Sequence, residues 1–375
     1  GLVQALLLGM KNRISAKQRE TLVAGGVSHL FAISGLHFCL LALLMYQAGK
    51  WFYSRSHRLI LLCPPQRVLP ALLIIPLAAY LFLTGNAWST RRAFLMVSFV
   101  TLLLLRGRRT SPFALLATIA LCLLLENPLA LFQPGFQLSF AGVAGILAWL
   151  PLWQEPLARR SIIVRLPLTL LLSTLAATLA TLPASIWHFH IISPAGLLTN
   201  LVAIPLIAWG AVPAGLAGLA LTPFSALLSK VGLLTCAKLV IFATSIVNGI
   251  SQWPMLSTIP LYITTSELIL LIGTLLFLLP LGRKEKQWPR RILIFLATVI
   301  AALLTQTDVA DLQITAISVG QGDATVISLA DDVHYLVDGG GLPNSSIDPG
   351  ERLVAPALGR MGIDSLQGVI LTHNH

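Results

Sequence analysis

Long apolar runs separated by short polar stretches dominate the first 306 residues of the chain. About ten of these runs approach the length that a helix needs to cross the apolar core of a lipid bilayer. The pattern therefore predicts an α-helical polytopic membrane protein over residues 1–306. The expected spans are residues 30–48, 68–84, 91–105, 112–125, 136–152, 166–189, 196–222, 231–249, 261–282 and 292–306.

The two ends of the chain follow other patterns. Residues 1–25 mix basic and apolar side chains, which favours a short amphipathic helix on the membrane surface, with a solvated loop as the alternative. After residue 306, apolar and polar residues alternate in the way that is typical of strands. We therefore expect a second domain, of α/β type, over residues 307–375. Its expected strands cover residues 312–317, 324–329, 333–337 and 368–371, and its expected helix covers residues 349–362.

The composition agrees with membrane spans. Of the 375 residues, 56% are hydrophobic and only 10% are charged, and the apolar runs are too long for a water-soluble core. The four cysteines lie apart in apolar segments, without the spacing of a disulfide framework or a zinc knuckle. We interpret them as small hydrophobic residues.

The basic residues indicate how the spans are oriented. Nearly all of those in loops follow the first, third, fifth, seventh and ninth expected spans. Because cytoplasmic loops are enriched in Lys and Arg, this distribution places these loops in the cytoplasm and the domain after residue 306 outside it. Lys238 fits neither side because it lies inside the expected span 231–249, so it is a candidate for a residue that faces a pore.

A group of polar residues lies at the start of the first expected span. His29, Ser34 and His37 directly precede a continuous apolar run, and neighbouring glycines favour a broken helix there. Polar groups at membrane depth usually line a cavity or a pathway, and interrupted helices often carry substrate sites. For any one of these residues alone, a role in packing between helices is the alternative.

Other polar residues enter the membrane farther along the chain. Arg91 and Arg92 lie at the external end of a span, which indicates either an anionic ligand outside or side chains that extend to lipid headgroups. Gln137 and Ser139 begin another span after a non-helical connector. Asn200 lies among prolines that interrupt two adjacent spans, where freed backbone groups need a wet or protein-lined environment.

Four polar segments follow one another along the chain: HLFAISGLH at 29–37, LTGNAWSTRRAFLM at 83–96, NPLALFQPGFQLSF at 127–140, and the region from ATLPASIWHFH to TNLVAIPL at 180–206. In this order they resemble the signatures of the ComEC family of competence proteins. The resemblance implies a channel that translocates single-stranded DNA across the cytoplasmic membrane during natural transformation.

The resemblance also implies a location and partners. The chain would be a multi-pass protein of the cytoplasmic membrane with an extracytoplasmic second domain. Its partners would be single-stranded DNA, the lipid bilayer, a DNA receptor, other competence proteins and further copies of the chain in a homo-oligomer. The DNA-channel candidates are His29, Ser34, His37, Arg91, Arg92, Gln137, Ser139, Asn200 and Lys238.

The second domain carries a resemblance of its own. The SVGQGDA string at 318–324 and the THNH string at the end are similar to the metallo-β-lactamase-like domain that is fused to ComEC channels. The resemblance implies that His373 and His375 are the first two ligands of a divalent metal, zinc or manganese, while Asp338 and Asp323 hold turns near the site. In the complete protein such a metal would activate water against a phosphodiester, as in a nuclease.

The same motif continues, in that family, with further ligands that do not follow in this sequence. We therefore expect the chain to belong to a longer product, to bind no metal stably as it stands and to be inactive as a hydrolase. The first residue, Gly rather than Met, leads to the same expectation of a longer product.

Two other functions explain parts of the pattern. A small-molecule or proton-coupled transporter would account for broken helices and histidines within the membrane, but it leaves the second domain without a purpose. A membrane-anchored metallohydrolase would account for the second domain, but an anchor needs only one or two spans. An inverted internal repeat would favour the transporter, and none is evident in the sequence.

Overall fold

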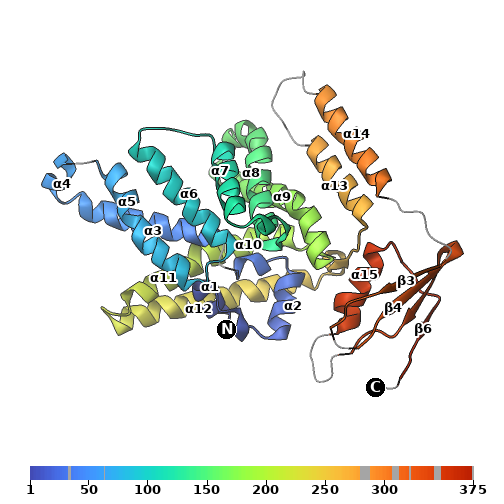
Figure 1. Ribbon diagram of the computed structural model, residues 1–375. Helices are drawn as coiled ribbons and strands as arrows, with labels where there is room; N and C mark the ends of the chain where they lie inside the picture. The colour runs from blue at the N-terminus through green and yellow to red at the C-terminus, as the bar shows by residue number, and fades with distance from the viewer. Residues whose placement is uncertain are drawn as a thin grey trace. The chain divides into compact units, whose positions relative to one another are not determined.

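The computed structural model describes residues 1–375 except 33–34, 63, 279–287, 306–311, 321, 342–347 and 374–375. The described chain is mostly helical and ends in a small mixed sheet (Figure 1). It forms two compact units, which are described separately. The first contains residues 1–181 and 193–259, and the second contains residues 182–192 and 260–375.

Helices build the whole of the first unit, and several begin with recognisable caps. The Ser111 and Ser225 hydroxyls accept hydrogen bonds from backbone N–H groups in the first turns of α7 and α12. Proline occupies the first turn of α5, α7 and α8, where no N–H partner is needed. The helices are α1 (Leu2–Leu8), α2 (Ala16–Ala24), α3 (Gly35–Tyr53), α4 (His57–Leu62), α5 (Pro65–Leu83), α6 (Trp88–Leu105), α7 (Pro112–Glu126), α8 (Pro134–Ala158), α9 (Ile162–Phe189), α10 (Gly196–Ala203), the π-helix η4 (Ile204–Ala211), α11 (Val212–Leu221) and α12 (Ala226–Ser251).

Five of the described helices are long and apolar enough to cross a membrane. They are α6, α8, α9, the continuous helix formed by α10, η4 and α11, and α12. Each of the ten expected runs overlaps a helix, and five helices of the described part of the chain reach the required length and composition. Shorter apolar helices cover residues 68–83, 112–126, 265–278 and 291–304.

The expectation for residues 1–25 is wrong for residues 2–8. These residues form α1, which is neither a loop nor an exposed surface helix but is buried: Leu6 is 1% exposed and Leu7 is 2% exposed. Both pack with Phe31 and with residues of η4, α11 and α12 in the largest hydrophobic cluster. The Tyr80 hydroxyl of α5 also donates a hydrogen bond to the Leu7 carbonyl, at 3.3 Å. The closely spaced leucines of α1 therefore serve the core, and only α2 remains largely exposed.

The second unit ends in a four-stranded sheet whose strand order is β3-β4-β5-β6. The first two pairings are antiparallel and the β5–β6 pairing is parallel. The crossover to β6 runs through a π-helical turn, η8 (Gly350–Val354), and α15 (Ala355–Arg360), which places Val354 against Val326 and Leu336 in the core. The strands are β3 (Leu312–Ala316), β4 (Thr325–Leu329), β5 (Val333–Val337) and β6 (Gly368–Ile370).

These strands and the helical crossover confirm the elements expected after residue 306. The buried positions alternate along β4 and β5, in the period of two on which the prediction rested. The same unit contains the helices α13 (Thr265–Leu278) and α14 (Trp288–Leu304), which pack against each other, and the short β1 (Ile191–Ile192). The short β2 (Ile259–Pro260) pairs with β1.

Small residues let α8 and α9 approach each other at one point. A Cβ atom added to Gly145 would lie 2.4 Å from the Ala180 Cβ and 2.6 Å from the Ala176 carbonyl oxygen. Gly142 lies on the same helix, but a Cβ atom there would lie 3.5 Å from the Thr181 methyl group, which is an ordinary contact. Close helix contacts in membranes depend on such small residues.

We predict that Gly145→Ala lowers the free energy of unfolding by about 1–3 kcal/mol, because the added methyl group forces the two helices apart. Gly142→Ala is the matched control on the same helix. It should leave stability unchanged or raise it slightly, because alanine favours the helix. Thermal unfolding of the detergent-solubilised chain measures both variants, and equal losses of stability would contradict the packing described.

Candidate functional site

The loop between α2 and α3 connects the first polar segment to the last one. The Ser193 hydroxyl donates a hydrogen bond to the Ala24 carbonyl at 2.6 Å, and the buried Thr199 hydroxyl donates to the Gly25 carbonyl at 2.6 Å. Gly26 has a positive φ of 65° and contacts Gly196 so closely that an added Cβ atom would lie 2.7 Å from the Gly196 Cα. The loop therefore docks on the first turns of α10.

Arg92 joins the other segments. It lies in the second turn of α6, and only 8% of it is exposed. Its Nε donates a hydrogen bond to the Ser139 Oγ at 2.8 Å, and its guanidinium carbon lies 5.7 Å from the centre of the Phe140 ring. Gly35, at the start of α3, leaves room for the same group, because an added Cβ atom would lie 2.9 Å from Nη2 of Arg92.

The charge of Arg92 has no carboxylate partner among the described residues. A guanidinium stays protonated in proteins, so burial does not remove this charge. A buried charge without an opposite charge is costly, and one hydroxyl, one thioether contact to Met96 and an aromatic face compensate it only in part. The arrangement is therefore suited to an anion, which would supply the missing charge.

Arg91 has a different environment although it is the next residue. Its guanidinium forms an ion pair with Glu126 at the end of α7 and lies 5.2 Å from the Trp88 ring centre. The Trp88 indole donates a hydrogen bond to Gln133, and the Gln137 side chain donates one to the Leu131 carbonyl at 2.8 Å. These contacts link α6 to α7 and to the start of α8. The Glu126 carboxylate balances the charge of Arg91.

Glu126 is the residue that sequence reasoning missed. It ends an apolar run and belongs to none of the polar clusters, but it is one of few acidic residues in the first 305. This scarcity of acidic residues could have identified Glu126. A single carboxylate among spans that carry arginines is expected to pair with one of those arginines.

The remaining candidates are spread over the first unit. His29 is exposed, with Nδ1 at 3.2 Å from the Gly26 carbonyl oxygen, whereas His37 in α3 is fully buried. Asn200 is 7% exposed, and its side-chain oxygen has no hydrogen-bond partner in the described part of the chain. Lys238 lies on the exposed face of α12, a helix that packs on α10, η4 and α11. Ser34 lies outside the described residues.

In the second unit, Asp338 holds the segment that precedes His373. The Thr372 backbone N–H donates to one Asp338 carboxylate oxygen at 2.9 Å, and the Thr372 hydroxyl donates to the other at 2.5 Å. These two bonds lower the pKa of the Asp338 carboxyl group from its usual value. The Thr372 hydroxyl also lies 2.7 Å from Nδ1 of His373.

Asp323 contributes through its backbone. Its carbonyl oxygen accepts a hydrogen bond from the Gly340 N–H at 2.9 Å, which ties the β3–β4 connection to the loop after β5. Its side chain is exposed. No group of three or more His, Cys, Asp or Glu side chains with metal-site geometry occurs among the described residues, and His375 lies outside them.

Comparisons with known proteins find relatives that match nearly the whole chain. Curated relatives include ComE operon protein 3 of Bacillus subtilis, which is 28% identical over 396 residues, with 100% of this chain and 48% of the relative covered. Competence protein ComA of Neisseria gonorrhoeae is 26% identical over 381 residues, with 100% of this chain and 50% of the relative covered. Uncharacterized protein YcaI of Escherichia coli is 27% identical over 404 residues, with 98% of this chain and 48% of the relative covered.

The chain thus spans about half the length of the curated relatives that it matches. No solved structure matches it. The model of a family described as "Competence protein" matches residues 6–286, a range that includes all four polar segments and the Arg92 cluster. This chain therefore belongs to the competence protein family.

Proposed function

We propose that the chain forms part of the path by which a single DNA strand crosses the cytoplasmic membrane, and that Arg92 binds phosphate groups of the strand. The observation that carries the proposal is the buried Arg92 guanidinium, which three of the four polar segments surround without supplying a carboxylate. Membership of the competence protein family and relatives named for competence support the same function.

The physical argument starts from the charge of DNA. Moving even one unpaired charge into the apolar part of a bilayer costs several kcal/mol or more, so a strand needs polar partners along its whole path. Arginine suits this task because its planar group binds phosphate oxygens in pairs. A phosphate bound to Arg92 would supply the negative charge that no described residue provides. Because such binding involves no contact with the bases, it would have no sequence preference.

Burial of Arg92 sets a condition for this binding. Because only 8% of Arg92 is exposed, the proposal requires neighbouring helices to separate before the guanidinium contacts a strand. In the same proposal, His29, Ser34, His37, Gln137, Asn200 and Lys238 line farther parts of the path and Arg91 lies near its external mouth. Lys238 supports this assignment, because an exposed lysine in the middle of α12 needs water or an anion beside it.

The domain after residue 306 belongs to the proposal as the beginning of a metallo-β-lactamase-like domain outside the cytoplasm. His373 and His375 stay as the predicted first ligands of zinc or manganese. The described residues alone do not fit a metal site, because His373 is the one described imidazole of that pair. We therefore assign no hydrolytic step to the chain, and the DNA receptor and the other competence proteins also remain proposed partners.

The function is tested by measuring labelled DNA that becomes resistant to nuclease inside cells with and without the complete gene. Loss of protected DNA on deletion, with binding of DNA at the cell surface retained, supports a role in crossing the membrane. Unchanged uptake overturns the proposal for that host and favours transport of a smaller solute.

We predict that Arg92→Gln lowers the amount of protected DNA by about tenfold or more, because it removes a charged hydrogen-bond donor from a buried site. Ser139→Ala should lower uptake less, since the charge remains but its orientation is lost. Arg106→Gln, at the exposed other end of α6, is the matched control and should behave as the parent protein. Membrane levels are compared by immunoblot, and normal uptake by Arg92→Gln at equal levels would exclude phosphate binding by this residue.

The next prediction compares the effects of replacing Arg91 and Arg92 on DNA uptake. Replacing both with Gln should lower uptake while the protein remains in the membrane. Because the Glu126 ion pair already balances Arg91, Arg91→Gln alone should reduce uptake less than Arg92→Gln. The reverse order, in the same assay of protected DNA, would show that Arg91 rather than Arg92 carries the function.

For the second unit, we predict that Asp338→Ala increases hydrogen exchange of the Thr372 amide by about tenfold, because each lost hydrogen bond is worth about 1 kcal/mol. Asp323→Ala is the control, since its side chain is exposed and only its backbone carbonyl accepts a bond. Exchange is followed by mass spectrometry of the whole chain. Equal exchange in both variants would mean that Asp338 does not hold the segment before His373.

A further inference from the structure

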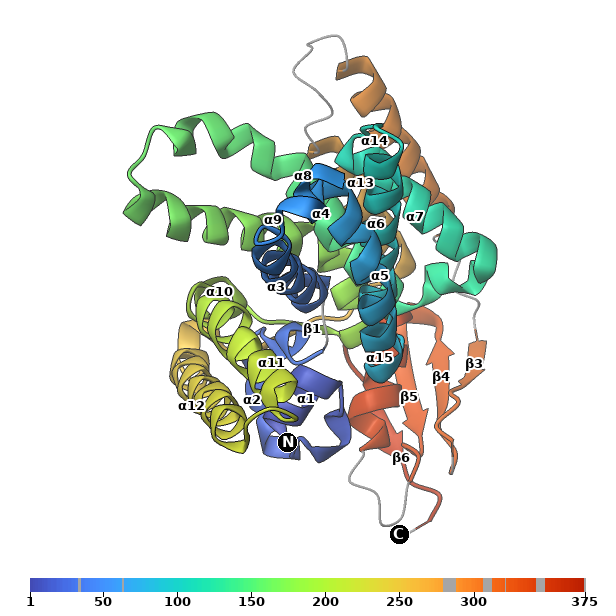
Figure 2. The same ribbon diagram turned by 90° about the vertical axis from the view of Figure 1, so that its left-hand side faces the viewer.

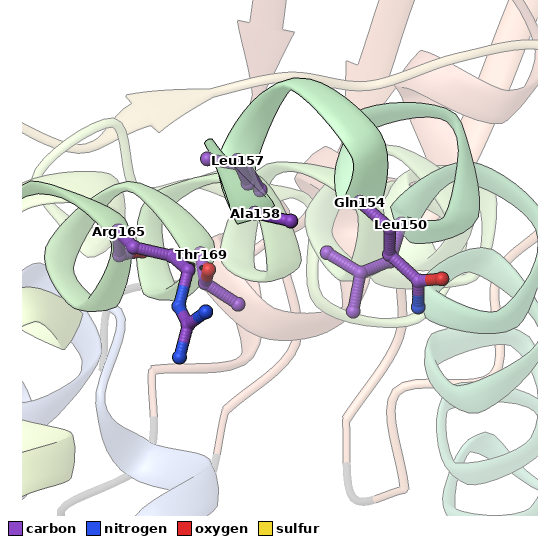
Figure 3. Close-up of a pocket in the computed structure, with 6 residues that line it drawn as sticks. All are labelled: Leu150, Gln154, Leu157, Ala158, Arg165 and Thr169. Carbon is purple, nitrogen blue, oxygen red and sulfur yellow. Dashed lines mark hydrogen bonds between the residues drawn. The ribbon is translucent and has the colours of Figure 1, made fainter. Parts of the chain in front are cut away.

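The hairpin of α8 and α9 is closed at one point and open near its turn. The two helices meet at Gly145, and residues 159–161 connect them. Between these places the helices diverge (Figure 2). A pocket of about 240 Å³ lies in the gap close to the turn, and Figure 3 shows its lining. The lining residues are Leu150, Gln154, Leu157, Ala158, Arg165 and Thr169.

The pocket has an apolar side and a polar side. Leu150, Leu157 and Ala158 form a hydrocarbon wall on α8, while Arg165 and Thr169 approach from α9 (Figure 3). The Thr169 hydroxyl donates a hydrogen bond to the Arg165 carbonyl at 2.7 Å. The Arg165 guanidinium itself forms no hydrogen bond or ion pair within the part of the chain that the structure describes.

The surroundings of Arg165 place it at a membrane boundary. Ile163 is 82% exposed and Leu166 is 45% exposed, so a surface suited to lipid chains lies directly beside the charge. Arg159 and Arg160 in the turn add two further positive charges. The loop distribution of basic residues puts this turn on the cytoplasmic side, where anionic lipids gather.

We propose that this pocket, the α8–α9 lipid pocket, binds one anionic phospholipid. Its headgroup phosphate contacts Arg165, with the Gln154 amide as a second donor, and the start of an acyl chain lies along Leu150 and Leu157. The proposal does not depend on the transport of DNA, and none of the lining residues is a candidate for the DNA path.

A lipid explains the pocket better than a free phosphate ion does. A phosphate ion would use Arg165 and Gln154 but would leave the hydrocarbon wall in contact with water. Covering that wall with methylene groups is favourable by about 25 cal/mol for each Å² removed from water. A zwitterionic lipid fits less well, because it brings a cation next to three arginines.

The test compares ligands on the purified full chain in detergent micelles by native mass spectrometry. Phosphatidylglycerol should remain bound to the parent protein more than phosphatidylcholine. Arg165→Gln should reduce retained phosphatidylglycerol by about fivefold, the effect expected of one arginine near anionic lipid. Arg160→Gln removes the same charge from the same turn without touching the pocket, and it should bind as the parent does.

A second variant separates a lipid from a free anion. Ala158 is exposed and lines the pocket, so Ala158→Trp fills it without disturbing the core and keeps Arg165. It should lose phosphatidylglycerol as Arg165→Gln does. Unchanged lipid binding by either variant, equal retention of the two lipids, or displacement of phosphatidylglycerol by inorganic phosphate alone would each overturn the proposal.

Discussion

The carbonyl groups of Ala24 and Gly25 stand at the end of α2, where no further helical turn supplies donors. In an apolar environment such groups need partners, because each unsatisfied one costs free energy comparable to a lost hydrogen bond. Ser193 and Thr199 provide these partners from the start of α10, more than 160 residues away in the chain. This docking fixes the end of α2 and Gly26 against the start of α10.

The two arginines of α6 show how adjacent residues acquire different roles. Successive side chains on a helix point about 100° apart, so Arg91 and Arg92 face different neighbours. Arg91 meets Glu126 and becomes part of the contacts between helices, whereas Arg92 meets Ser139 and Phe140 and keeps its charge. The motif therefore combines a cation that an ion pair balances with a buried cation that no described carboxylate balances.

Much of the fold follows from local patterns, and the parts that do not follow depend on distant contacts. Alternation along Val333–Val337 predicted β5 because burial on one face is a local property of a strand. The burial of Leu6 was missed because it depends on helices that come more than 190 residues later. Arg92 and Ser139 were each selected as polar residues in an apolar segment, but their hydrogen bond and the role of Glu126 required the packing of α6, α7 and α8.

The ion pair of Arg91 and Glu126 has a consequence for any anion that approaches this end of α6. To bind Arg91, a small anion must displace the Glu126 carboxylate. Because that carboxylate belongs to the same chain, its effective concentration beside Arg91 is very high. A long polyanion presents a new phosphate each time one dissociates, so rebinding compensates for weak single contacts. Under the proposed function, this end of α6 would therefore discriminate by polymer length, favouring strands over the mononucleotides and inorganic phosphate that surround a cell.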